Sequence, residues 1–495
     1  MKSVRFIHIH PADNTAVALK PMDRGTSADT GTIRVTLSED IKQGHKFAVS
    51  NIPKGDRILK YGSPIGTASE DIPAGSWVHT HNMKTELTAE GTYAYTPENH
   101  QLQTVPPSSF SGFYREDGRA GTRNEIWIIP TVGCVNSLAK RIENMSQKYV
   151  SSSIDAVAAF PHPYGCSQTG EDQENTRRIL SSLIRHPNAG GVLVLGLGCE
   201  NTGIETLKKY IGEYDRNRVR FLNAQDCADE TEEALSAVEM LAEYAGRSER
   251  EPLSTSKLIV GLKCGGSDGL SGITANPLVG AFTDRHIASG GSAVLTEVPE
   301  MFGAETILMN RCADYSVFEK TVEMINGFKR YYTGLGQPVY ENPSPGNLEG
   351  GITTLEDKSL GCIQKAGSAQ VSDVIGYGDS VSDRGLTLLS APGNDLVSTT
   401  ALAAAGAQII LFTTGRGTPF GAPVPTVKIS SNTNLFERKR NWIDFDAGVI
   451  ADGADMNDTA YALYSFIIKA ASGERVKSES AGFRDIAIFK SGVTL

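Results

Sequence analysis

The stretch Leu262-Lys263-Cys264-Gly265-Gly266-Ser267-Asp268-Gly269-Leu270-Ser271-Gly272-Ile273-Thr274-Ala275-Asn276-Pro277 joins an apolar run, residues 258–262, to a segment of helical character. Its four glycines let the backbone turn sharply and let a ligand approach it closely. In an open α/β sheet, ligands bind where strands end and helices begin. The stretch therefore predicts a strand, a ligand-binding loop and a helix. A plain glycine-rich connection with ordinary turn residues is the alternative.

Several chemically different side chains share this loop. They are a cation, a thiol, a hydroxyl, a carboxylate and an amide, on Lys263, Cys264, Ser267, Asp268 and Asn276 respectively. A connection without a ligand does not need that variety. We take all five as candidate site residues.

The same rhythm of apolar strand, polar loop and helix recurs along the chain. The strand ends fall in residues 126–136, 156–168, 191–201, 293–300, 388–395 and 410–417. Helix formers with apolar spacing near 3.6 lie between them, for example in residues 174–185 and 230–244. Repeated βα units predict an α/β fold with largely parallel, Rossmann-like sheets.

Four of the seven cysteines fall at predicted strand ends, where side chains face a shared crevice. They are Cys134, Cys166, Cys199 and Cys264. Thiolates bind transition metals, although a cysteine also fits a tight glycine turn as a small apolar residue. Cys227 and Cys312 lie in or near helical stretches and are predicted to be structural.

The chain length and the positions of turn and linker signals predict several domains, since 495 residues are too many for one hydrophobic core. Residues 1–95 contain short β runs broken by turn signals and predict a small β-domain. A polar, proline-containing linker is placed at 96–115, a second α/β domain at 116–252, and a C-terminal domain at 253–495. The linker is long enough to swing the small domain over another active site.

Composition excludes several functional classes. The chain has 40% hydrophobic and 21% charged residues, a net charge of −10 and no basic run. This pattern argues against a nucleic-acid or anionic-membrane partner. No apolar stretch approaches the ~18 residues of a membrane span, and no signal-peptide core follows Met1. We expect a soluble, cytoplasmic protein.

His79-Thr80-His81-Asn82 closes the predicted small domain. Alternate residues of a strand point to one face, so His79 and His81 could hold one metal or one substrate. Two partly exposed histidines on a β-edge are the alternative.

Two further motifs carry charge. Glu297 and Glu300 follow a predicted strand and could bind a divalent metal or divide acid and base roles, with solvated helix-start acids as the alternative. Glycines flank Arg416 and leave its guanidinium free to bind a carboxylate. Together with Lys263, the cations Lys358 and Lys365 complete the groups suited to an anionic substrate.

Residues 264–277, 296–300, 415–419 and 79–82 resemble the signatures of the altronate and galactarate dehydratase family, and the resemblance extends through residues 487–495. It implies an N-terminal β-clip of the SAF type, a second domain able to form a homodimer contact, and a Rossmann-like C-terminal domain with a metal site. It also implies Fe²⁺ or Mn²⁺ dependence and a place in hexuronate breakdown. Residues 342–347 and 349–361 favour the altronate branch.

The implied reaction removes the C2 proton of a sugar acid and expels the C3 hydroxyl, giving 2-dehydro-3-deoxy-D-gluconate from altronate. From this resemblance we predict a role for each candidate residue. The metal is assigned to Glu297 and Glu300 with Cys264 or Asp268; substrate binding to Lys263, Ser267, Asn276 and Arg416; acid catalysis to His79 or His81; and base catalysis to His162.

Three other functions stay open. The first is a galactarate dehydratase, which should need a second carboxylate clamp. The second is a sugar-acid binding protein without catalysis. The third is a nicotinamide dehydrogenase, which the lack of a G-x-G-x-x-G fingerprint after a first strand disfavours.

Overall fold

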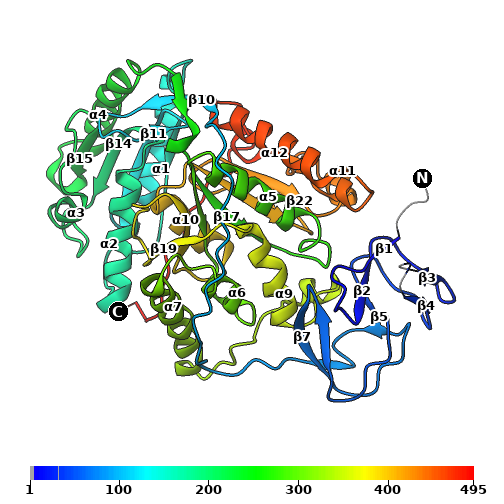
Figure 1. Cartoon of the computed structure of the whole chain (residues 1–495). Helices are drawn as coiled ribbons and strands as arrows, with labels where there is room; N and C mark the ends of the chain where they lie inside the picture. Colours follow the sequence, from blue (N-terminus) through cyan, green and yellow to red (C-terminus); the bar gives the residue numbers. More distant parts are fainter. Residues whose placement is uncertain (1–4, 30, 32, 495) are drawn as a thin grey trace.

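The computed structural model describes residues 5–29, 31 and 33–494. Its N-terminal region is antiparallel β throughout (Figure 1). One sheet has the order β1-β2-β5-β8, from Phe6–Ile7, Thr15–Ala18, Lys46–Ala48 and Trp77–Val78. A second has the order β6-β7-β9, from Arg57–Lys60, Ser63–Ala68 and Met83–Lys84. A hairpin joins β3 (Ser27–Asp29) to β4 (Arg34–Thr36). The predicted β-domain is therefore present.

Two buried lysines join this β region to the C-terminal part. Lys46 and Lys60 each lie 2.9 Å from a carboxylate oxygen of Asp357. All three side chains are at most 2% exposed. Buried charges are tolerated only when they are paired, so this triad fixes how the β region sits against the C-terminal part.

The following segment, residues 85–108, contains no helix or strand but is packed along the C-terminal part. Tyr93 Oη donates to Glu305 Oε1 at 2.6 Å, and Tyr95 Oη donates to the Cys312 carbonyl at 2.8 Å. Strand β10 (Ser109–Tyr114) lies inside the range predicted as linker and pairs with β16 (Glu251–Ser254). The segment is thus held by its own contacts rather than free to swing.

The second part is a parallel four-stranded sheet with helices on both faces. Its order is β13-β12-β14-β15, from Ala156–Ala159, Glu125–Pro130, Ala189–Gly196 and Val219–Asn223. Ile126 and Ile128 pack against α1 (Asn136–Met145) and α4 (Glu230–Ala245). Trp127 and Ile129 face α2 (Gly170–Ile184) and α3 (Ile204–Ile211). The alternation follows from the two-residue period of a strand.

The third part is a seven-stranded, all-parallel sheet. Its order is β19-β20-β18-β17-β21-β22-β23, from Val371–Ile375, Gly385–Leu389, Ser292–Leu295, Ile259–Cys264, Ile409–Thr414, Thr426–Ser430 and Phe445–Asp446. Helices α5 (Ala275–Ala288) and α12 (Met456–Ala471) share a core with one face, and α10 (Asp395–Ala404) packs on the other. The α/β fold with largely parallel sheets is confirmed.

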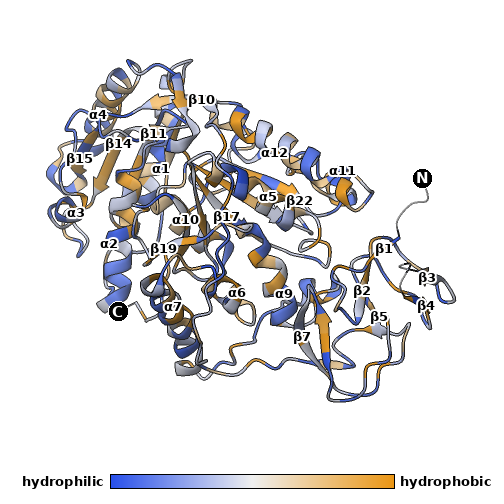
Figure 2. Ribbon diagram, viewed as in Figure 1, coloured by the Kyte–Doolittle hydropathy of each residue, from blue (hydrophilic) through white to orange (hydrophobic). Residues whose placement is uncertain are grey.

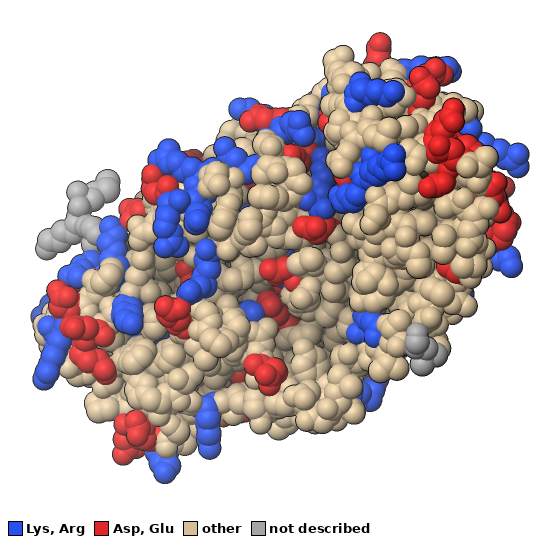
Figure 3. Space-filling view, turned by 180° about the vertical axis from the view of Figure 1, so that it is seen from behind, with Lys and Arg blue, Asp and Glu red and all other residues tan. Residues whose placement is uncertain are grey.

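The surface and interior follow this layering. Apolar residues line the central strands, and polar residues gather on the outer helix faces (Figure 2). Lys, Arg, Asp and Glu are interspersed over the face shown in Figure 3, without a continuous basic surface. No helix within the described ranges is long and apolar enough to cross a membrane.

Residues 337–351, predicted as an irregular functional loop, are largely irregular and contain one short helix, α8 (Pro345–Glu349). This loop lies under the β region: the ring nitrogen His79 Nε2 is 3.0 Å from the Leu348 carbonyl oxygen.

Candidate metal and substrate site

The glycine-rich loop of residues 264–277 begins at the centre of the large sheet. Strand β17 lies between β18 and β21 and ends at Cys264, so Lys263 and Cys264 stand at the carboxyl edge. Both are fully buried, with at most 1% of the side chain exposed. Glu297 and Glu300 follow the neighbouring strand β18, which brings them to the same edge.

Three potential ligand atoms converge there. Cys264 Sγ lies 3.2 Å and Cys362 Sγ 3.1 Å from Glu300 Oε2, and the two sulfur atoms are 3.3 Å apart. Cys362 comes from the end of α9 (Leu355–Cys362). This is the one group of three or more His, Cys, Asp or Glu side chains in the described ranges whose ligand atoms all lie within 4.8 Å of one another.

Three buried lysines surround this thiol and carboxylate group. Lys358 Nζ is 2.9 Å from Glu300 Oε1 and 3.0 Å from Asn342 Oδ1. Lys263 Nζ binds Glu297 closely and lies 2.9 Å from Asp395 Oδ1. Lys365 Nζ lies 3.3 Å from the other Glu297 oxygen.

The charges of the lysines and carboxylates in this cluster cancel. Lys263, Lys358 and Lys365 face three carboxylates, those of Glu297, Glu300 and Asp395. If both cysteines ionise, two negative charges remain in a buried site, where uncompensated charge is costly. A divalent cation would balance them.

Glu300 is ionised in this group, whereas the Cys362 thiol keeps its proton until a cation binds. Burial alone would raise the pKa of Glu300, but the amines of Lys358, Lys263 and Lys365 hold it well below its usual range. The hydrogen bond with Cys264, burial and the nearby Glu300 charge raise the pKa of Cys362 far above that of a free thiol. The Cys362 proton would therefore leave when a cation binds, as is usual for thiolate sites.

The donor set selects the kind of cation. Two sulfur atoms and one carboxylate oxygen favour a transition metal such as iron or zinc over calcium or magnesium, which prefer all-oxygen shells. The residues present thus fit a transition-metal site. They do not by themselves identify the metal.

Glu297 shows local strain at this site. Its φ is 72°, in the left-handed region that side chains other than glycine and asparagine rarely adopt. Its carboxylate accepts a hydrogen bond from the Cys264 backbone N–H at 3.0 Å and binds Lys263 and Lys365. Such strain clusters at functional sites, where the surrounding contacts maintain it. Here the contacts hold Glu297 beside the cysteine.

A small cavity next to Cys362 is lined from both parts of the molecule. Lys60 and Tyr61 come from the β region, while Ser267, Asp357 and Lys358 come from the C-terminal part. Ser267 Oγ is buried and has no hydrogen-bond partner in the part of the chain that the structure describes. An unpaired buried hydroxyl is costly, and a ligand in this cavity would satisfy it.

The structure places the histidines away from the thiol group. His79 is buried at the contact with α8, and its ring stacks on His45 at 5.4 Å. Burial lowers the pKa of His79 below its ordinary value. His81 is exposed and packs beside Trp77.

His162 lies in the second part, in the loop after β13. Its Nε2 is 2.8 Å from the Pro130 carbonyl oxygen, and its Nδ1 accepts from the Tyr164 backbone N–H at 3.2 Å. Burial lowers its pKa to about 4. Both ring nitrogens are thus used to hold the loop.

Asp268 and Asn276 line the cavity, but their polar side-chain atoms are bound by other residues of the protein. Asp268 accepts from Ser431 Oγ at 2.8 Å and from Asn432 Nδ2 at 3.0 Å, and it lies outside the thiol and carboxylate group. Asn276 donates to the Gly361 carbonyl at 2.9 Å and accepts from Thr413 at 2.6 Å.

Arg416 lies at the surface. Its guanidinium is 3.0 Å from Glu349 Oε2 and donates to the Gly346 carbonyl at 3.3 Å. The arginine thus contacts the residues of α8. It is not among the residues that line the small cavity.

Neither Cys362 nor Tyr61 was predicted from the sequence as a site residue. Cys362 follows no strand; the unusual feature of its surroundings is that every residue of α9 is buried although the helix contains Glu356, Asp357 and Lys358. Charged residues in a wholly buried helix signal a polar site, but burial is not visible in one sequence. Tyr61 lies in a turn with φ of 61°, which the sequence does not mark either.

The three other candidate cysteines do follow strands, at the carboxyl edge of the smaller sheet. Cys134, Cys166 and Cys199 are exposed free thiols. Cys166 Sγ lies 3.4 Å from Asn201 Oδ1 in the loop that also contains Cys199. They lie outside the buried group of Cys264.

Family models match all three parts of the chain. Residues 255–494 match "D-galactarate/Altronate dehydratase, C-terminal", and residues 112–246 match "D-galactarate dehydratase/Altronate hydrolase, second domain". Residues 4–86 match "Altronate/galactarate dehydratase SAF domain". The fold, the polar edge of the large sheet and these matches define an enzyme of the hydro-lyase class, which eliminates water from its substrate.

Relatives align over essentially the whole chain. An altronate dehydratase of Bacillus subtilis (strain 168) is 53% identical over 504 residues, covering 100% of both chains. An altronate dehydratase of Escherichia coli (strain K12) is 50% identical, covering 99% of this chain and 100% of its own. A galactarate dehydratase (L-threo-forming) of the same strain is 32% identical, covering 95% and 93%. The chain belongs to the altronate/galactarate dehydratase family, which confirms the resemblance found in its motifs.

Proposed function

We propose that this chain dehydrates D-altronate to 2-dehydro-3-deoxy-D-gluconate and water, as a step of hexuronate catabolism. The observation that carries the proposal is the difference in identity between relatives. Two altronate dehydratases match from end to end at 53% and 50% identity, whereas the galactarate dehydratase matches at 32%.

The proposed enzyme uses Fe²⁺ or Mn²⁺ held by Cys264, Cys362 and Glu300. The support is the convergence of these three buried donors and the excess of two negative charges when both thiols ionise. The metal would polarise the departing C3 hydroxyl and offset the negative charge of an enolate-like intermediate. Glu297 would border the metal, held in place by Lys263 and Lys365.

The small cavity has a volume of about 10 Å³, room for roughly one water molecule, so it is the proposed place of one substrate hydroxyl. The rest of the substrate would enter only when the β region moves away from the C-terminal part. The substrate carries a carboxylate, and the amines of Lys60 and Lys358 line the cavity. Ser267 Oγ would pair with a substrate hydroxyl, because it has no partner of its own within the described residues. Docking of the β region over this cavity would exclude water, which strengthens each of these electrostatic contacts.

Dehydration needs a base for the C2 proton and an acid for the C3 hydroxyl. We propose that the general acid comes from the SAF domain and is His79 or His81. Tyr61 is a third candidate, because it is the one of these three residues that lines the cavity. Nothing in the contacts of His162 supports its predicted role as base, since its ring nitrogens bind Pro130 and Tyr164. We also propose a homodimer, which light scattering in solution tests.

Anaerobic turnover tests the proposed function. Protein stripped with a chelator would receive Fe²⁺, Mn²⁺, Mg²⁺ or no metal, and 2-keto-3-deoxy acid formation from D-altronate would be followed. We expect product with Fe²⁺ or Mn²⁺ alone. Consumption of galactarate but not altronate would transfer the assignment to the diacid, and inactivity on both would leave a binding protein. Single substitutions of Tyr61, His79 and His81 then separate the candidate acids by their kcat.

A further inference from the structure

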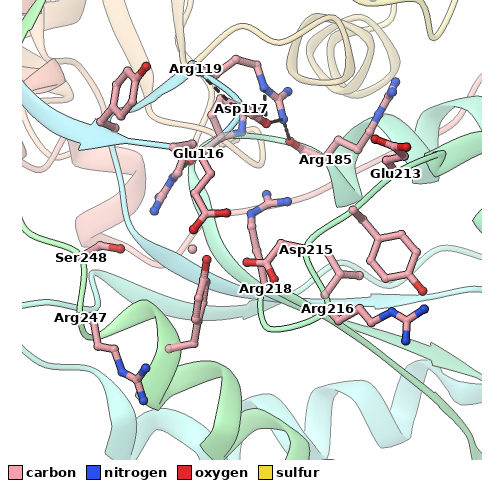
Figure 4. Close-up of a pocket in the computed structure, with 17 residues that line it drawn as sticks. Glu116, Asp117, Arg119, Arg185, Glu213, Asp215, Arg216, Arg218, Arg247 and Ser248 are labelled. Carbon is pink, nitrogen blue, oxygen red and sulfur yellow. Dashed lines mark hydrogen bonds and ion pairs between the residues drawn. The ribbon is translucent and has the colours of Figure 1, made fainter.

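A cavity of about 780 Å³ lies in the second part of the chain, away from the thiol and carboxylate group (Figure 4). Six arginines contribute to its wall: Arg115, Arg119, Arg185, Arg216, Arg218 and Arg247. We call this cavity the arginine pocket. None of its lining residues belongs to the candidate metal and substrate site.

The arginine pocket is built where the chain enters and leaves the second part. Residues 114–119 follow β10, and residues 247–248 precede β16, the strand that pairs with β10. The remaining walls are residues 185–190, which lead into β14, and residues 213–219, which lead into β15. The pocket therefore lies at the amino edge of the four-stranded sheet. Catalytic sites of such sheets lie at the opposite edge, so the location favours a binding role.

The positive charge of the pocket is poorly compensated. Four carboxylates accompany the six arginines, those of Glu116, Asp117, Glu213 and Asp215. Of these, Asp117 pairs with Arg119 at less than 4 Å. The guanidinium groups of Arg185, Arg216 and Arg247 make no hydrogen bond or ion pair within the described part of the chain. Figure 4 shows Arg218 between Glu116 and Asp215 in the middle of the pocket.

Two further arginines are held rigidly without a carboxylate partner. The buried Arg115 donates to the Pro187 and Arg123 carbonyls at 2.8 and 3.0 Å and to Asn124 Oδ1 at 3.0 Å. Arg218 donates to the Ala189 and His186 carbonyls at 3.0 and 2.6 Å. These neutral acceptors hold the two guanidinium groups in place but do not balance their positive charge.

Burial and, after it, repulsion between the arginines disfavour the charged form of both groups. Burial, followed by repulsion from Arg218, lowers the pKa of Arg115 to about 9. Burial, followed by repulsion from Arg119, lowers the pKa of Arg218 to about 10. Guanidinium groups prefer to be paired with anions when they are removed from water.

We propose that the arginine pocket is a binding site for a small phosphate-bearing metabolite. Six guanidiniums and four carboxylates leave two positive charges, the charge that a phosphate ester neutralises near neutral pH. The guanidiniums come from four separate segments, and those of Arg115, Arg119, Arg185 and Arg218 lie close enough to repel one another, which suits the several oxygens of a tetrahedral dianion. The Arg216 and Arg247 side chains are exposed at the rim of the pocket. A single planar carboxylate would need one arginine fork. The tyrosines at the wall, Tyr114, Tyr214 and Tyr244, can cover the organic part of the ligand.

Calorimetric titration of the whole protein with inorganic pyrophosphate and with a sugar phosphate tests this site. Citrate at equal charge and potassium chloride at equal ionic strength serve as comparison ligands. We expect saturable binding of both phosphates at one site per chain, at least about tenfold tighter than citrate. Equal binding of citrate would overturn the assignment to phosphate. Absence of saturable phosphate binding would overturn the site.

The double substitution Arg185→Gln and Arg216→Gln places the binding in the pocket, and it should leave the fold intact because neither guanidinium has a protein partner. We expect the dissociation constant for pyrophosphate to rise about tenfold or more. Arg218→Lys, which keeps the charge and loses the fork, should weaken binding as well. The control is Arg438→Gln on the exposed surface of α11 (Thr433–Arg438). Unchanged binding in the double variant, or an equal loss in the control, would refute the proposal. No step of this test depends on turnover of altronate.

Discussion

Cys264 Sγ and Cys362 Sγ lie 3.3 Å apart although 98 positions separate the two residues in the chain. One cysteine ends the central strand of the large sheet, and the other ends a buried helix that also contacts the SAF domain through Asp357. Their shared neighbour, Glu300, is bound on its other oxygen by Lys358. The assembly of this group therefore depends on three elements of the C-terminal domain: β17, the segment that contains Glu300, and α9. The packing of the SAF domain against α9 supports it.

Replacing Cys362 by serine should abolish tight metal binding. Serine keeps the size of the side chain but offers a hydroxyl, which is a poor ligand for the borderline metals that thiolates select. We expect the affinity for the transition metal to fall by about 100-fold or more, since even outer contacts of metal sites are worth ~10–100-fold. Elemental analysis after gel filtration would then find little metal bound to the variant. Turnover should fall as well.

The matched control is Cys312→Ser. Cys312 is also buried, but its sulfur lies 3.3 Å from Thr321 Oγ1 and 3.6 Å from the Leu308 carbonyl, outside the thiol and carboxylate group. This variant should keep its metal. Equal metal loss in both variants would show that the effect comes from the fold, and full metal retention in Cys362→Ser would remove the cysteine from the site.

The sequence was a good guide wherever a site residue follows a strand. Cys264 ends one strand of the parallel sheet, Glu297 and Glu300 follow the neighbouring strand, and the βα rhythm predicts both that sheet and its polar edge. Cys362 and Tyr61 could not be found in this way, because a helix end and a turn gain their position from tertiary packing. Asp268 has the residue type of a ligand, yet Ser431 and Asn432 from a distant strand end occupy its oxygens. A single sequence does not show which hydrogen-bond donors the fold will bring to a carboxylate.

Replacing Asp357 by asparagine should loosen the SAF domain. Lys46 and Lys60 would then be left as two buried ammonium groups without their shared carboxylate. Breaking a buried ion pair from one side costs about 3–5 kcal/mol. We expect a lower urea midpoint and faster proteolysis in residues 85–108, which have no helix or strand of their own.

A surface ion pair across the same two parts provides the comparison. Lys20 Nζ lies 3.1 Å from Asp452 Oδ1, with side chains 42% and 50% exposed. Because solvent screens such a pair, Asp452→Asn should cost less than about 1 kcal/mol. If both substitutions change the midpoint equally, the buried triad is not what holds the SAF domain.

The protein should lose stability between pH 6.5 and pH 4. Burial lowers the pKa of His162 and His286 to about 4 and that of His186 to about 3, from an ordinary value of 6.5. In this window the unfolded chain binds a proton at each histidine and the folded protein does not, so stability falls as the pH falls. Each histidine contributes a slope of about 1.4 kcal/mol per pH unit.

Urea unfolding at several pH values measures this slope. His186→Gln should reduce the slope by roughly one histidine's share, about 1.4 kcal/mol per pH unit, whatever it does to stability at pH 7. His100→Gln, at an exposed position, should leave it unchanged. Identical slopes for the wild type and His186→Gln would mean that the interior histidines do not determine acid stability.

Ser267→Ala should raise KM for altronate and leave kcat and metal content nearly unchanged. The Ser267 hydroxyl lines the small cavity without a protein partner, so its loss removes a contact to the ligand and no contact within the fold. One neutral hydrogen bond is worth about 0.5–1.5 kcal/mol, which corresponds to roughly a two- to twelvefold change in KM.

The informative control is Ser359→Ala, since Ser359 Oγ in α9 is equally buried and unpaired but does not line the cavity. That variant should keep the wild-type KM and be at least as stable, because an unpaired buried hydroxyl is removed. A KM change in Ser359→Ala alone, or in neither variant, would place the substrate somewhere other than the cavity beneath the SAF domain. A fall in kcat at constant KM for Ser267→Ala would mean instead that the hydroxyl acts in the transition state and not in binding.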